Sequence, residues 1–246
     1  MGLDARLRLA RTIVVTGTLG GGDVFRDHVV ELFRAGADIV QLRDTQASRE
    51  TLLDSLEVTR SAAMQLSKTV AVTSDVDLAK EFGADLLVLP ASGMDPGLAH
   101  AKLHEYALVG RSVHDEKAAE AAAKDSEINF ALVGPVYLPA NAPFPAPGLD
   151  LVRAAAERMP VGEVAGTPWF ATGGVDLSTI DEILANGARR VSITVDSPDD
   201  AAVVKQLADR LRLAWVQDPA LKDYAFGVFG MGAPRATFRS SGPTAW

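Results

Sequence analysis

The sequence predicts one α/β domain folded as a closed (β/α)8 barrel of the TIM-barrel class. Short β-branched and apolar runs alternate with longer amphipathic stretches, and this alternation repeats eight times. Because strand and helix follow each other strictly, the strands should be parallel and joined by crossover helices. The chain has 246 residues, close to the roughly 250 that are typical of this barrel. An open doubly wound sheet has the same order of elements and stays the alternative.

The expected strands are short runs rich in Val, Ile, Leu and Thr. They are Thr12–Val15, Asp38–Arg43, Thr69–Thr73, Leu86–Leu89, Ala107–Gly110, Asn129–Val133, Trp169–Thr172 and Arg190–Val195. Helices are expected between them, where apolar residues recur three or four positions apart. These stretches are Val24–Arg34, Glu50–Leu66, Val76–Phe82, Glu116–Lys124, Leu149–Arg158, Leu177–Ala185 and Ala201–Ala214.

Capping residues and glycines mark the ends of these units. The segment Ser74-Asp75-Val76-Asp77 follows the third expected strand and has the composition of a helix N-cap. Gly83, Gly110 and Gly187 each follow a helical or turn segment. A residue that tolerates positive φ often ends a helix, so we expect the three glycines in this role.

The barrel should occupy residues 1–215, followed by an irregular tail over 216–246. After Ala214 the sequence has Gly, Pro, Ser and scattered aromatics but no periodicity. We expect the tail to be ordered by packing on the barrel or on a second subunit, which makes a homo-oligomer possible. The aromatic residues expected to be buried are Tyr224, Phe226, Phe229 and Trp246.

The composition argues against nucleic acid and membranes as partners. The formal net charge of −8 argues against nucleic acid and against anionic membranes. No apolar run reaches the roughly 20 residues that span a bilayer, and the N-terminus has no apolar segment of a secretory signal. The absence of cysteine excludes disulfides and thiolate chemistry. We therefore expect a cytoplasmic protein.

Polar residues at the ends of strands are the candidates for function, because barrels bind ligands at the C-terminal face. In the second strand, the two-residue period places Gln41 and Arg43 on one face and Val40 and Leu42 on the other. An unpaired guanidinium under the helices would be costly, so Gln41 and Arg43 should point into the mouth of the barrel. The alternative is that Arg43 pairs with a carboxylate inside the barrel.

Other strand ends offer an anion site and a candidate base. Gly173-Gly174 after the seventh strand can leave backbone N–H groups bare for a phosphate, although the pair is also a common tight turn. Three acids after the eighth strand would repel a phosphate unless they point outward. They are Asp196, Asp199 and Asp200. His114 after the fifth strand is either a general base, next to Asp115, or a capping or packing residue.

Seven motifs in register over about residues 10 to 205 resemble thiamine phosphate synthase, especially its actinobacterial form, and the related thiazole tautomerases. They are Gln41-Leu42-Arg43-Asp44, Asp75-Val76-Asp77-Leu78-Ala79, Gly83-Ala84-Asp85, Gly110-Arg111-Ser112-Val113-His114, Gly134-Pro135-Val136-Tyr137, Pro147-Gly148-Leu149 and Pro168-Trp169-Phe170-Ala171-Thr172-Gly173-Gly174. The resemblance implies a transferase of thiamine biosynthesis. That family joins a hydroxymethylpyrimidine pyrophosphate to a thiazole phosphate and releases pyrophosphate with the help of Mg²⁺.

On this resemblance, part of the family's site is kept. The ligand- or phosphate-binding candidates are Gln41, Arg43, Ser112, Gly134, Gly173 and Gly174; Arg43, Ser112 and His114 are the catalytic candidates; Asp75 is the one metal candidate. The family's groups at the leaving pyrophosphate are largely replaced. Thr45 stands for a lysine and Gly93 for a second metal aspartate, while the loop after the sixth strand has Pro139, Asn141 and Ala142 in place of two hydroxyl residues and a lysine. The tautomerases have a histidine where this chain has Pro135.

These departures leave the activity open. We favour a barrel linked to thiamine biosynthesis that binds a small phosphorylated ligand at its mouth, with transferase activity lost or altered, as in a pseudoenzyme. Each missing charge-stabilising group typically costs about 10²–10³ in rate. The alternative is an active thiamine phosphate synthase, in which case Mg²⁺ is possible as a cofactor; no other cofactor is expected. A further alternative is a structural or protein-interaction barrel without catalysis.

Overall fold

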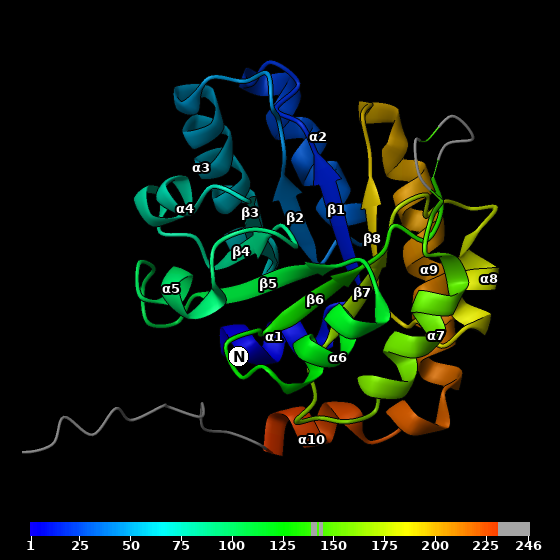
Figure 1. The fold of residues 1–246 in the computed structure, drawn as a ribbon. Coiled ribbons are helices and arrows are strands. Elements are labelled where there is room, and N and C mark those ends of the chain that lie inside the picture. The colour runs from blue at the N-terminus through cyan, green and yellow to red at the C-terminus, as the bar shows by residue number, and fades with distance from the viewer. Residues whose placement is uncertain (139–141, 143–144, 231–246) are drawn as a thin grey trace, which may run out of the picture.

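The chain forms a closed barrel of eight parallel strands in a computed structural model that describes residues 1–138, 142 and 145–230 (Figure 1). Each strand pairs with the next in sequence, and β8 pairs with β1. The predicted (β/α)8 barrel is therefore confirmed over the open sheet. The strands are β1 (Thr12–Thr16), β2 (Ile39–Leu42), β3 (Thr69–Thr73), β4 (Leu86–Leu89), β5 (Leu108–Val113), β6 (Phe130–Val133), β7 (Trp169–Thr172) and β8 (Val191–Thr194).

One helix follows each strand and covers the outside of the barrel. These helices are α2 (Gly22–Ala35), α3 (Arg49–Leu66), α4 (Val76–Phe82), α5 (Pro96–His100), α6 (Glu116–Lys124), α7 (Gly148–Arg158), α8 (Ile180–Ala185) and α9 (Ala201–Gln217). The helix α5 was not predicted, because five residues are too few to show a helical period. It begins where Asp95 accepts a hydrogen bond from the Leu98 amide and where Pro96 occupies the first turn. No helix in the described ranges is long and apolar enough to cross a membrane.

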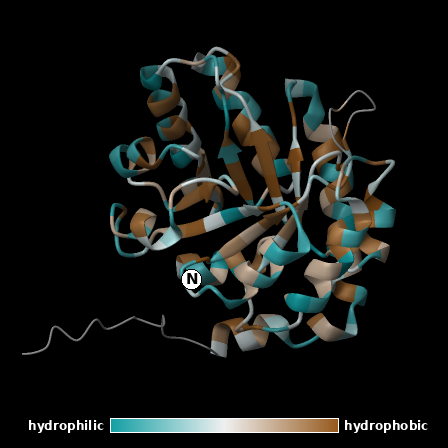
Figure 2. Cartoon of the chain, in the orientation of Figure 1, coloured by the Kyte–Doolittle hydropathy of each residue, from teal (hydrophilic) through white to brown (hydrophobic). Residues whose placement is uncertain are grey.

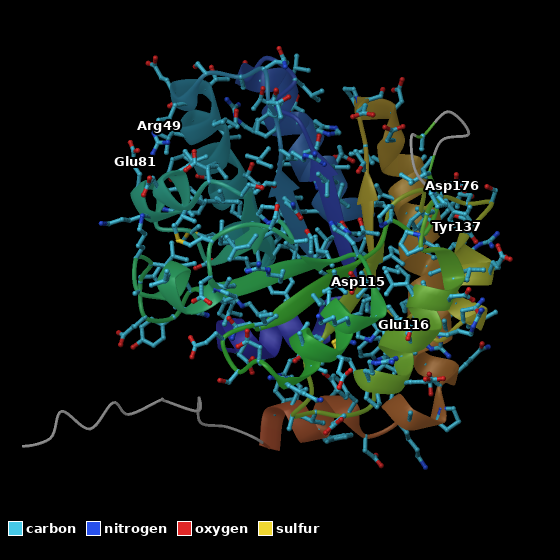
Figure 3. The ribbon with its side chains drawn as sticks, viewed as in Figure 1. Arg49, Glu81, Asp115, Glu116, Tyr137 and Asp176 are labelled. Atoms are coloured by element: carbon cyan, nitrogen blue, oxygen red, sulfur yellow. The ribbon has the colours of Figure 1, made fainter. Side chains whose placement is uncertain are left out.

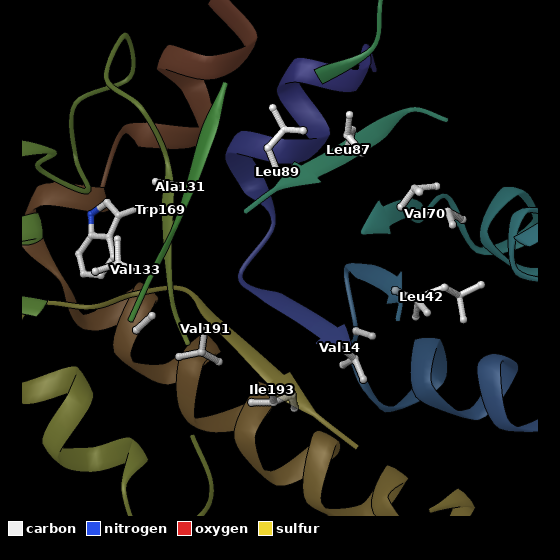
Figure 4. Close-up of a cluster of buried hydrophobic side chains, with 14 of the residues drawn as sticks. Val14, Leu42, Val70, Leu87, Leu89, Ala131, Val133, Trp169, Val191 and Ile193 are labelled. Carbon is white, nitrogen blue, oxygen red and sulfur yellow. The ribbon is translucent and has the colours of Figure 1, made fainter. Parts of the chain in front are cut away.

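Alternate residues of each strand belong to two separate apolar layers. The outer layer lies between strands and helices, and Figure 4 shows part of it, with Val14, Leu42 and Ile193 among its side chains. The inner layer fills the barrel and includes Ile39 and Phe170. Figure 2 shows the same division along the helices, which are hydrophilic on their outward faces and hydrophobic toward the strands. The two-residue period therefore decides which side chains reach the mouth.

Gly110 has a packing role that the sequence did not predict. It lies within β5 and not at the end of a helix, so the expected role was wrong for this glycine, whereas Gly83 and Gly187 have left-handed φ values of 67° and 99° as expected. A Cβ on Gly110 would lie 2.4 Å from the ring of Phe130. The Phe130 ring in turn packs edge-to-face on Phe170, with centroids 6.3 Å apart. Gly110 thus makes room for the aromatic filling of the barrel.

Both ends of the described chain lie at the base of the barrel, opposite the C-terminal strand ends (Figure 1). Helix α1 (Leu3–Leu9) places Leu7 in the inner apolar layer, and α10 (Tyr224–Gly230) packs on α1. Arg190 is fully buried there and donates to the Arg8 carbonyl oxygen at 2.9 Å and to the Tyr224 hydroxyl at 3.2 Å. Its guanidinium also lies over the rings of Trp215 and Tyr224.

The expected burial of the C-terminal aromatic residues is only partly observed in the described residues. Tyr224 is buried, as expected. Phe226 and Phe229 are exposed among the described residues, at 78% and 58%, which differs from the expectation. Trp246 lies outside the described residues. The sequence also did not predict the short helices η2 (Pro219–Leu221) and α10, which interrupt the expected irregular segment.

We expect Gly110→Ala to destabilise the barrel by about 1–3 kcal/mol, the usual cost of overpacking a dense core. The new methyl group would overlap the Phe130 ring. Urea unfolding measures the change, and Gly2→Ala is the control because a Cβ there meets nothing within 4 Å. Adding Phe130→Leu to Gly110→Ala should recover part of the loss. Equal stability of Gly110→Ala and the unaltered protein would contradict this account.

Candidate ligand-binding site at the barrel mouth

Gln41 presents an unpaired hydrogen-bond acceptor inside the barrel. Its neighbours Val40 and Leu42 belong to the outer layer, so Gln41 faces inward, as predicted. Its Nε2 donates to the Thr73 hydroxyl at 2.9 Å, and that hydroxyl donates to the Leu42 carbonyl oxygen at 2.8 Å. Since the Thr73 proton is already used, the amide nitrogen must be the atom that faces Thr73. The buried Oε1 therefore has no partner among the described residues and remains available to a ligand.

Arg43 directly follows β2, two residues after Gln41, and its side chain is exposed. The alternative from the sequence was an ion pair inside the barrel, but Arg43 has no acidic partner within 4.0 Å in the described residues. Its backbone N–H donates to the Thr16 carbonyl oxygen at 3.0 Å and continues the pairing of β1 and β2. The backbone of Arg43 is therefore held in place, while its guanidinium is accessible to an anion.

Asp44 holds the loops after β1 and β2 together. One carboxylate oxygen accepts from the hydroxyl and the amide of Thr18, at 2.7 and 3.1 Å, and the other accepts from the amides of Gln46 and Ala47. These hydrogen bonds, led by the one from the Thr18 hydroxyl, lower the pKa of Asp44 below its ordinary value. Asp44 thus orders the chain on both sides of Arg43.

The turn after β7 has bare amides, as the sequence predicted. Gly173 and Gly174 adopt left-handed φ values of 88° and 65°, and a Cβ on either would lie 2.5 Å from Pro135 or Tyr137. The Gly173 carbonyl oxygen accepts from the Tyr137 amide at 3.0 Å, but neither glycine N–H has a partner in the described part of the chain. Glycine is needed here for both conformation and close approach, and the free N–H groups suit an anion.

Tyr137 ties the segment after β6 to helix α8. Its hydroxyl donates to Glu182, and Figure 3 shows it on the same side of the barrel as Asp176. Burial, followed by the hydrogen bond to Glu182, raises the pKa of Tyr137 to about 12. The phenol therefore stays protonated at neutral pH and holds the chain that supports the Gly173-Gly174 turn.

The candidates on β5 and β6 have different roles. Ser112 faces inward, is half-buried, and its hydroxyl has no hydrogen-bond partner among the described residues. His114 is exposed, and its Nδ1–H donates to the Gly134 carbonyl oxygen, which leaves the Nε2 lone pair toward solvent. Asp115 is not its partner, because Asp115 caps α6 by accepting from the Ala118 amide at 2.7 Å. The Gly134 N–H is already donated to Val113, so Gly134 offers no free amide.

In the turn after β8, the carboxylate of Asp200 accepts hydrogen bonds from backbone amides of the same turn. The short helix η1 (Pro198–Asp200) begins at Ser197, and Asp200 accepts from the amides of Asp196 and Ser197 at 3.1 and 3.0 Å. Asp196 and Asp199 are exposed. No Lys or Arg of the described chain lies within 4.0 Å of these three carboxylates. Asp200 therefore caps the start of η1. Burial lowers the pKa of His28, and the charge of Asp200 opposes this shift.

Asp75 is committed to other partners. Ser74 turns the chain after β3 with a left-handed φ of 63°, and Asp75 then caps α4 by accepting from the Leu78 amide at 2.8 Å, as the sequence predicted for this segment. The second oxygen of Asp75 accepts from Arg49 at 3.3 Å, and Arg49 also pairs with Glu81 at 2.7 Å. Figure 3 shows Arg49 and Glu81 facing each other on α3 and α4.

The described residues do not form a magnesium site by themselves. Within those ranges no three His, Cys, Asp or Glu side chains gather as metal ligands. The residue at the second metal position, Gly93, donates to the Pro90 carbonyl oxygen, and a Cβ there would lie 2.8 Å from Pro90. Thr45 is exposed and carries no charge. Magnesium needs near-octahedral oxygen coordination, which Asp75 alone does not provide.

The fold and the site together define a (β/α)8 barrel with polar groups gathered at its mouth. The family model described as thiamine monophosphate synthase matches residues 12–196. A thiamine-phosphate synthase of Streptomyces avermitilis is 38% identical over 185 residues, which cover 73% of this chain and 83% of that one. One of Mycobacterium leprae is 34% identical over 226 residues, which cover 85% and 94%. The chain belongs to the thiamine monophosphate synthase family.

A solved structure supports the fold. A thiamine phosphate pyrophosphorylase from Pyrococcus furiosus superposes with a TM-score of 0.65, at 22% identity, over 92% of this chain and 99% of that one. The family model and the relatives from Streptomyces avermitilis and Mycobacterium leprae confirm the family resemblance predicted from the motifs and the link to thiamine biosynthesis. Because the relatives are synthases, the comparisons favour the active-enzyme alternative over the loss of activity that the replaced residues had suggested.

We expect Asp44→Asn to cost about 1 kcal/mol at pH 7, at the low end for hydrogen bonds to a charged group because the carboxylate is partly exposed. The pKa of Asp44 is lowered in the folded protein. Its contribution is therefore fully present above the ordinary value of 3.8 and is lost as the pH falls through the lower folded value. Unfolding measured between pH 7 and pH 3 should show the two proteins converging in acid, whereas Asp54→Asn, at an exposed position, should match the unaltered protein throughout. A constant gap would refute the assignment.

Proposed function

We propose that the protein is an active transferase of thiamine biosynthesis that joins a pyrimidinylmethyl group to the ring nitrogen of a thiazole. The family's substrates are hydroxymethylpyrimidine pyrophosphate and thiazole phosphate. The observation that carries the proposal is the pair formed by Gln41 on β2 and Arg43 just after it. Among the described residues, the buried amide oxygen of Gln41 has no hydrogen-bond partner and Arg43 has no acidic partner. An unpaired buried acceptor is costly in the free protein and calls for a ligand with a donor.

Each polar group of the mouth has a chemical task in this reaction. The Gln41 Oε1 accepts from an N–H of a heteroaromatic ring, and Thr73 fixes its orientation. Arg43 and the bare amides of Gly173 and Gly174 attract negative charge. The Ser112 hydroxyl and the Nε2 of His114 are further hydrogen-bonding groups at the rim. Bringing both substrates together in one mouth supplies proximity, which is a large part of the acceleration of bimolecular reactions.

The bond changes balance without a protein-bound intermediate. The carbon–oxygen bond between the pyrimidinylmethyl carbon and pyrophosphate breaks, and pyrophosphate leaves with the electron pair. The thiazole nitrogen forms the new carbon–nitrogen bond and becomes the cationic nitrogen of the product. The protein therefore has to stabilise the growing charge of the leaving group, and we assign this task to Arg43, which has no acidic partner in the described part of the chain.

A second candidate is ligand binding without transfer. The replaced residues at the leaving-group end favour it, because Thr45 is uncharged, Gly93 is held against Pro90, and Asp75 is shared between a helix cap and Arg49. Pro139 and Asn141 of the same end lie outside the described residues, and Ala142 has no donor or charge in its side chain. Under this candidate the same mouth holds a small phosphorylated molecule but does not release pyrophosphate.

An activity assay distinguishes transfer from ligand binding without transfer. The pyrimidine pyrophosphate is incubated with either the thiazole phosphate ester or the thiazole alcohol. The proposal expects pyrophosphate release and a joined product, detected by mass spectrometry. Arg43→Ala should lower kcat/KM by about 10²–10³, the usual cost of one preorganised charge-stabilising group. Arg34→Ala is the matched control, since that exposed arginine on α2 pairs with Glu31. Absence of product with both thiazoles would reject transfer, and calorimetric binding weakened by Arg43→Ala would then support the second candidate.

A further inference from the structure

Two polar groups inside the barrel are buried without a hydrogen-bond partner in the described part of the chain. They are the Oε1 atom of Gln41 and the Oγ atom of Ser192. Ser192 lies between Val191 and Ile193, which both belong to the outer layer, so its side chain faces inward. Gln41 and Ser192 are only 3% and 2% exposed. Because a buried polar atom without a partner lowers stability, both groups call for a partner beyond the described side chains.

The strand register brings Gln41 and Ser192 to one level of the barrel. Ser192 pairs with Ile13 of β1, which pairs with Ile39 of β2, two residues before Gln41. A barrel of this class has a shear of about eight residues over its eight strands, so residues of equal height advance by about one position per strand. Two strands onward from Ser192, the residue of equal height is therefore Gln41. Alternate strands contribute four side chains to this buried level, which are Gln41, Val88, Leu132 and Ser192.

The levels above and below agree with this assignment. Below the buried level lies an apolar level that contains Ile13 and the ring of Phe170. Above it lies a level with Val15 and three half-buried hydroxyl residues, which we call the hydroxyl level: Thr73, Ser112 and Thr172. Exposure thus rises toward the mouth, and Ser192 lies beneath the hydroxyl level. A ligand in the mouth would meet the hydroxyl level before it could reach Ser192.

The chemistry of the unpaired groups matches that of one water molecule. The Gln41 Oε1 only accepts hydrogen bonds, whereas the Ser192 hydroxyl can donate one. The two groups do not bond to each other, so one small molecule between them would satisfy both. Thr172, the in-register neighbour of Ser192 on the inner face, offers a third polar group. A buried water typically makes about three hydrogen bonds to such groups.

We propose that one buried water molecule joins Gln41 to Ser192 beneath the hydroxyl level, and that Ser192 is thereby a positioning residue for Gln41. The water donates to the Gln41 Oε1 and accepts from the Ser192 hydroxyl. Since an amide oxygen has two lone pairs, the Oε1 still accepts a donor of the ligand from above. Thr73 holds the amide nitrogen and the water holds the amide oxygen, which fixes the whole amide. The role toward the substrate rests on the proposed function, whereas the water itself does not.

A high-resolution crystal structure of the full chain and thermal unfolding test the water. The crystal structure should show an ordered water within about 3.2 Å of both the Gln41 Oε1 and the Ser192 Oγ. Ser192→Ala removes one anchor of the water and should lower the unfolding midpoint by about 2–4 °C, as for one lost hydrogen bond in a chain of this size. Well-defined side chains with no water between them, or an unchanged or higher midpoint in Ser192→Ala, overturn the inference.

Ser55→Ala is the matched control. Ser55 on α3 is also 2% exposed, and its hydroxyl has no hydrogen-bond partner among the described residues. It lies outside the barrel interior, away from the proposed water, so its removal should keep or raise the midpoint. Ser192→Cys keeps a similar volume with a weak donor, should act like Ser192→Ala, and decides the matter if the alanine variant does not fold.

Binding of the pyrimidine pyrophosphate, measured by calorimetry, tests the positioning role. Ser192→Ala and Ser192→Cys should weaken binding by about 3–10-fold, the scale of one hydrogen bond that acts through Gln41. In the activity assay, KM should rise by a similar factor while kcat stays within about twofold, because Gln41 holds the ring equally in ground and transition states. Unchanged binding in both variants overturns the positioning role while the proposed transfer stands. If the unaltered protein does not bind the compound, the proposed function and the positioning role both fail, and the water is decided by the crystal structure.

Discussion

The closure of eight parallel strands into one ring is the constraint on which the site depends. In a closed ring, alternate residues of every strand face either the helices or the interior, and a shift by one residue would exchange the two sets. The outward set is uniformly apolar on β2, with Val40 and Leu42, which fixes Gln41 and Arg43 on the inner side. The same alternation places Ser192 inside β8. The polar mouth is therefore a consequence of the apolar outer layer.

The lower part of the ring limits how deep a ligand can reach. Phe130 and Phe170 fill the interior in an edge-to-face pair. Gly110 has no side chain and so leaves space for the Phe130 ring. Gln41 lies in line with Val15 and Ala71 of the neighbouring strands, above this filling. Its unpaired oxygen is then a floor of the site, with Arg43 and the Gly173-Gly174 turn above it. On the proposed function, the group that recognises a flat ring and the groups that attract charge thus lie at two different depths.

The sequence predicted the fold well because the barrel repeats one pattern eight times. Helices α4 and α6 were predicted with their observed bounds, since a capping aspartate begins each of them. The helices α1, α5 and α10 have at most seven residues and showed no periodicity. Gly110 was misassigned because a glycine within a strand and a glycine at a helix end look alike in one dimension.

Pairings between side chains were harder to predict than positions on a face. Thr73 was not a candidate, although its place two residues after Ala71 puts it on the inner face. The bonds of Asp200 to the amides of Asp196 and Ser197 could be anticipated only from the capping pattern of a serine followed three residues later by an acid. The replaced residues at the leaving-group end suggested lost activity. A residue-by-residue comparison does not show whether groups elsewhere in the fold replace the missing ones, and the two relatives described above are synthases.

The buried Arg190 joins the two ends of the described chain at one pole of the barrel. Its guanidinium contacts the backbone of α1 and the hydroxyl and ring of Tyr224 in α10, with Trp215 of α9 beside it. A buried cation without a carboxylate is stabilised only while both terminal helices stay in place. The mouth of the barrel lies at the opposite pole, away from both ends of the described chain. Substitutions in α1 or α10 would thus lower the stability of the barrel before they altered the groups at the mouth.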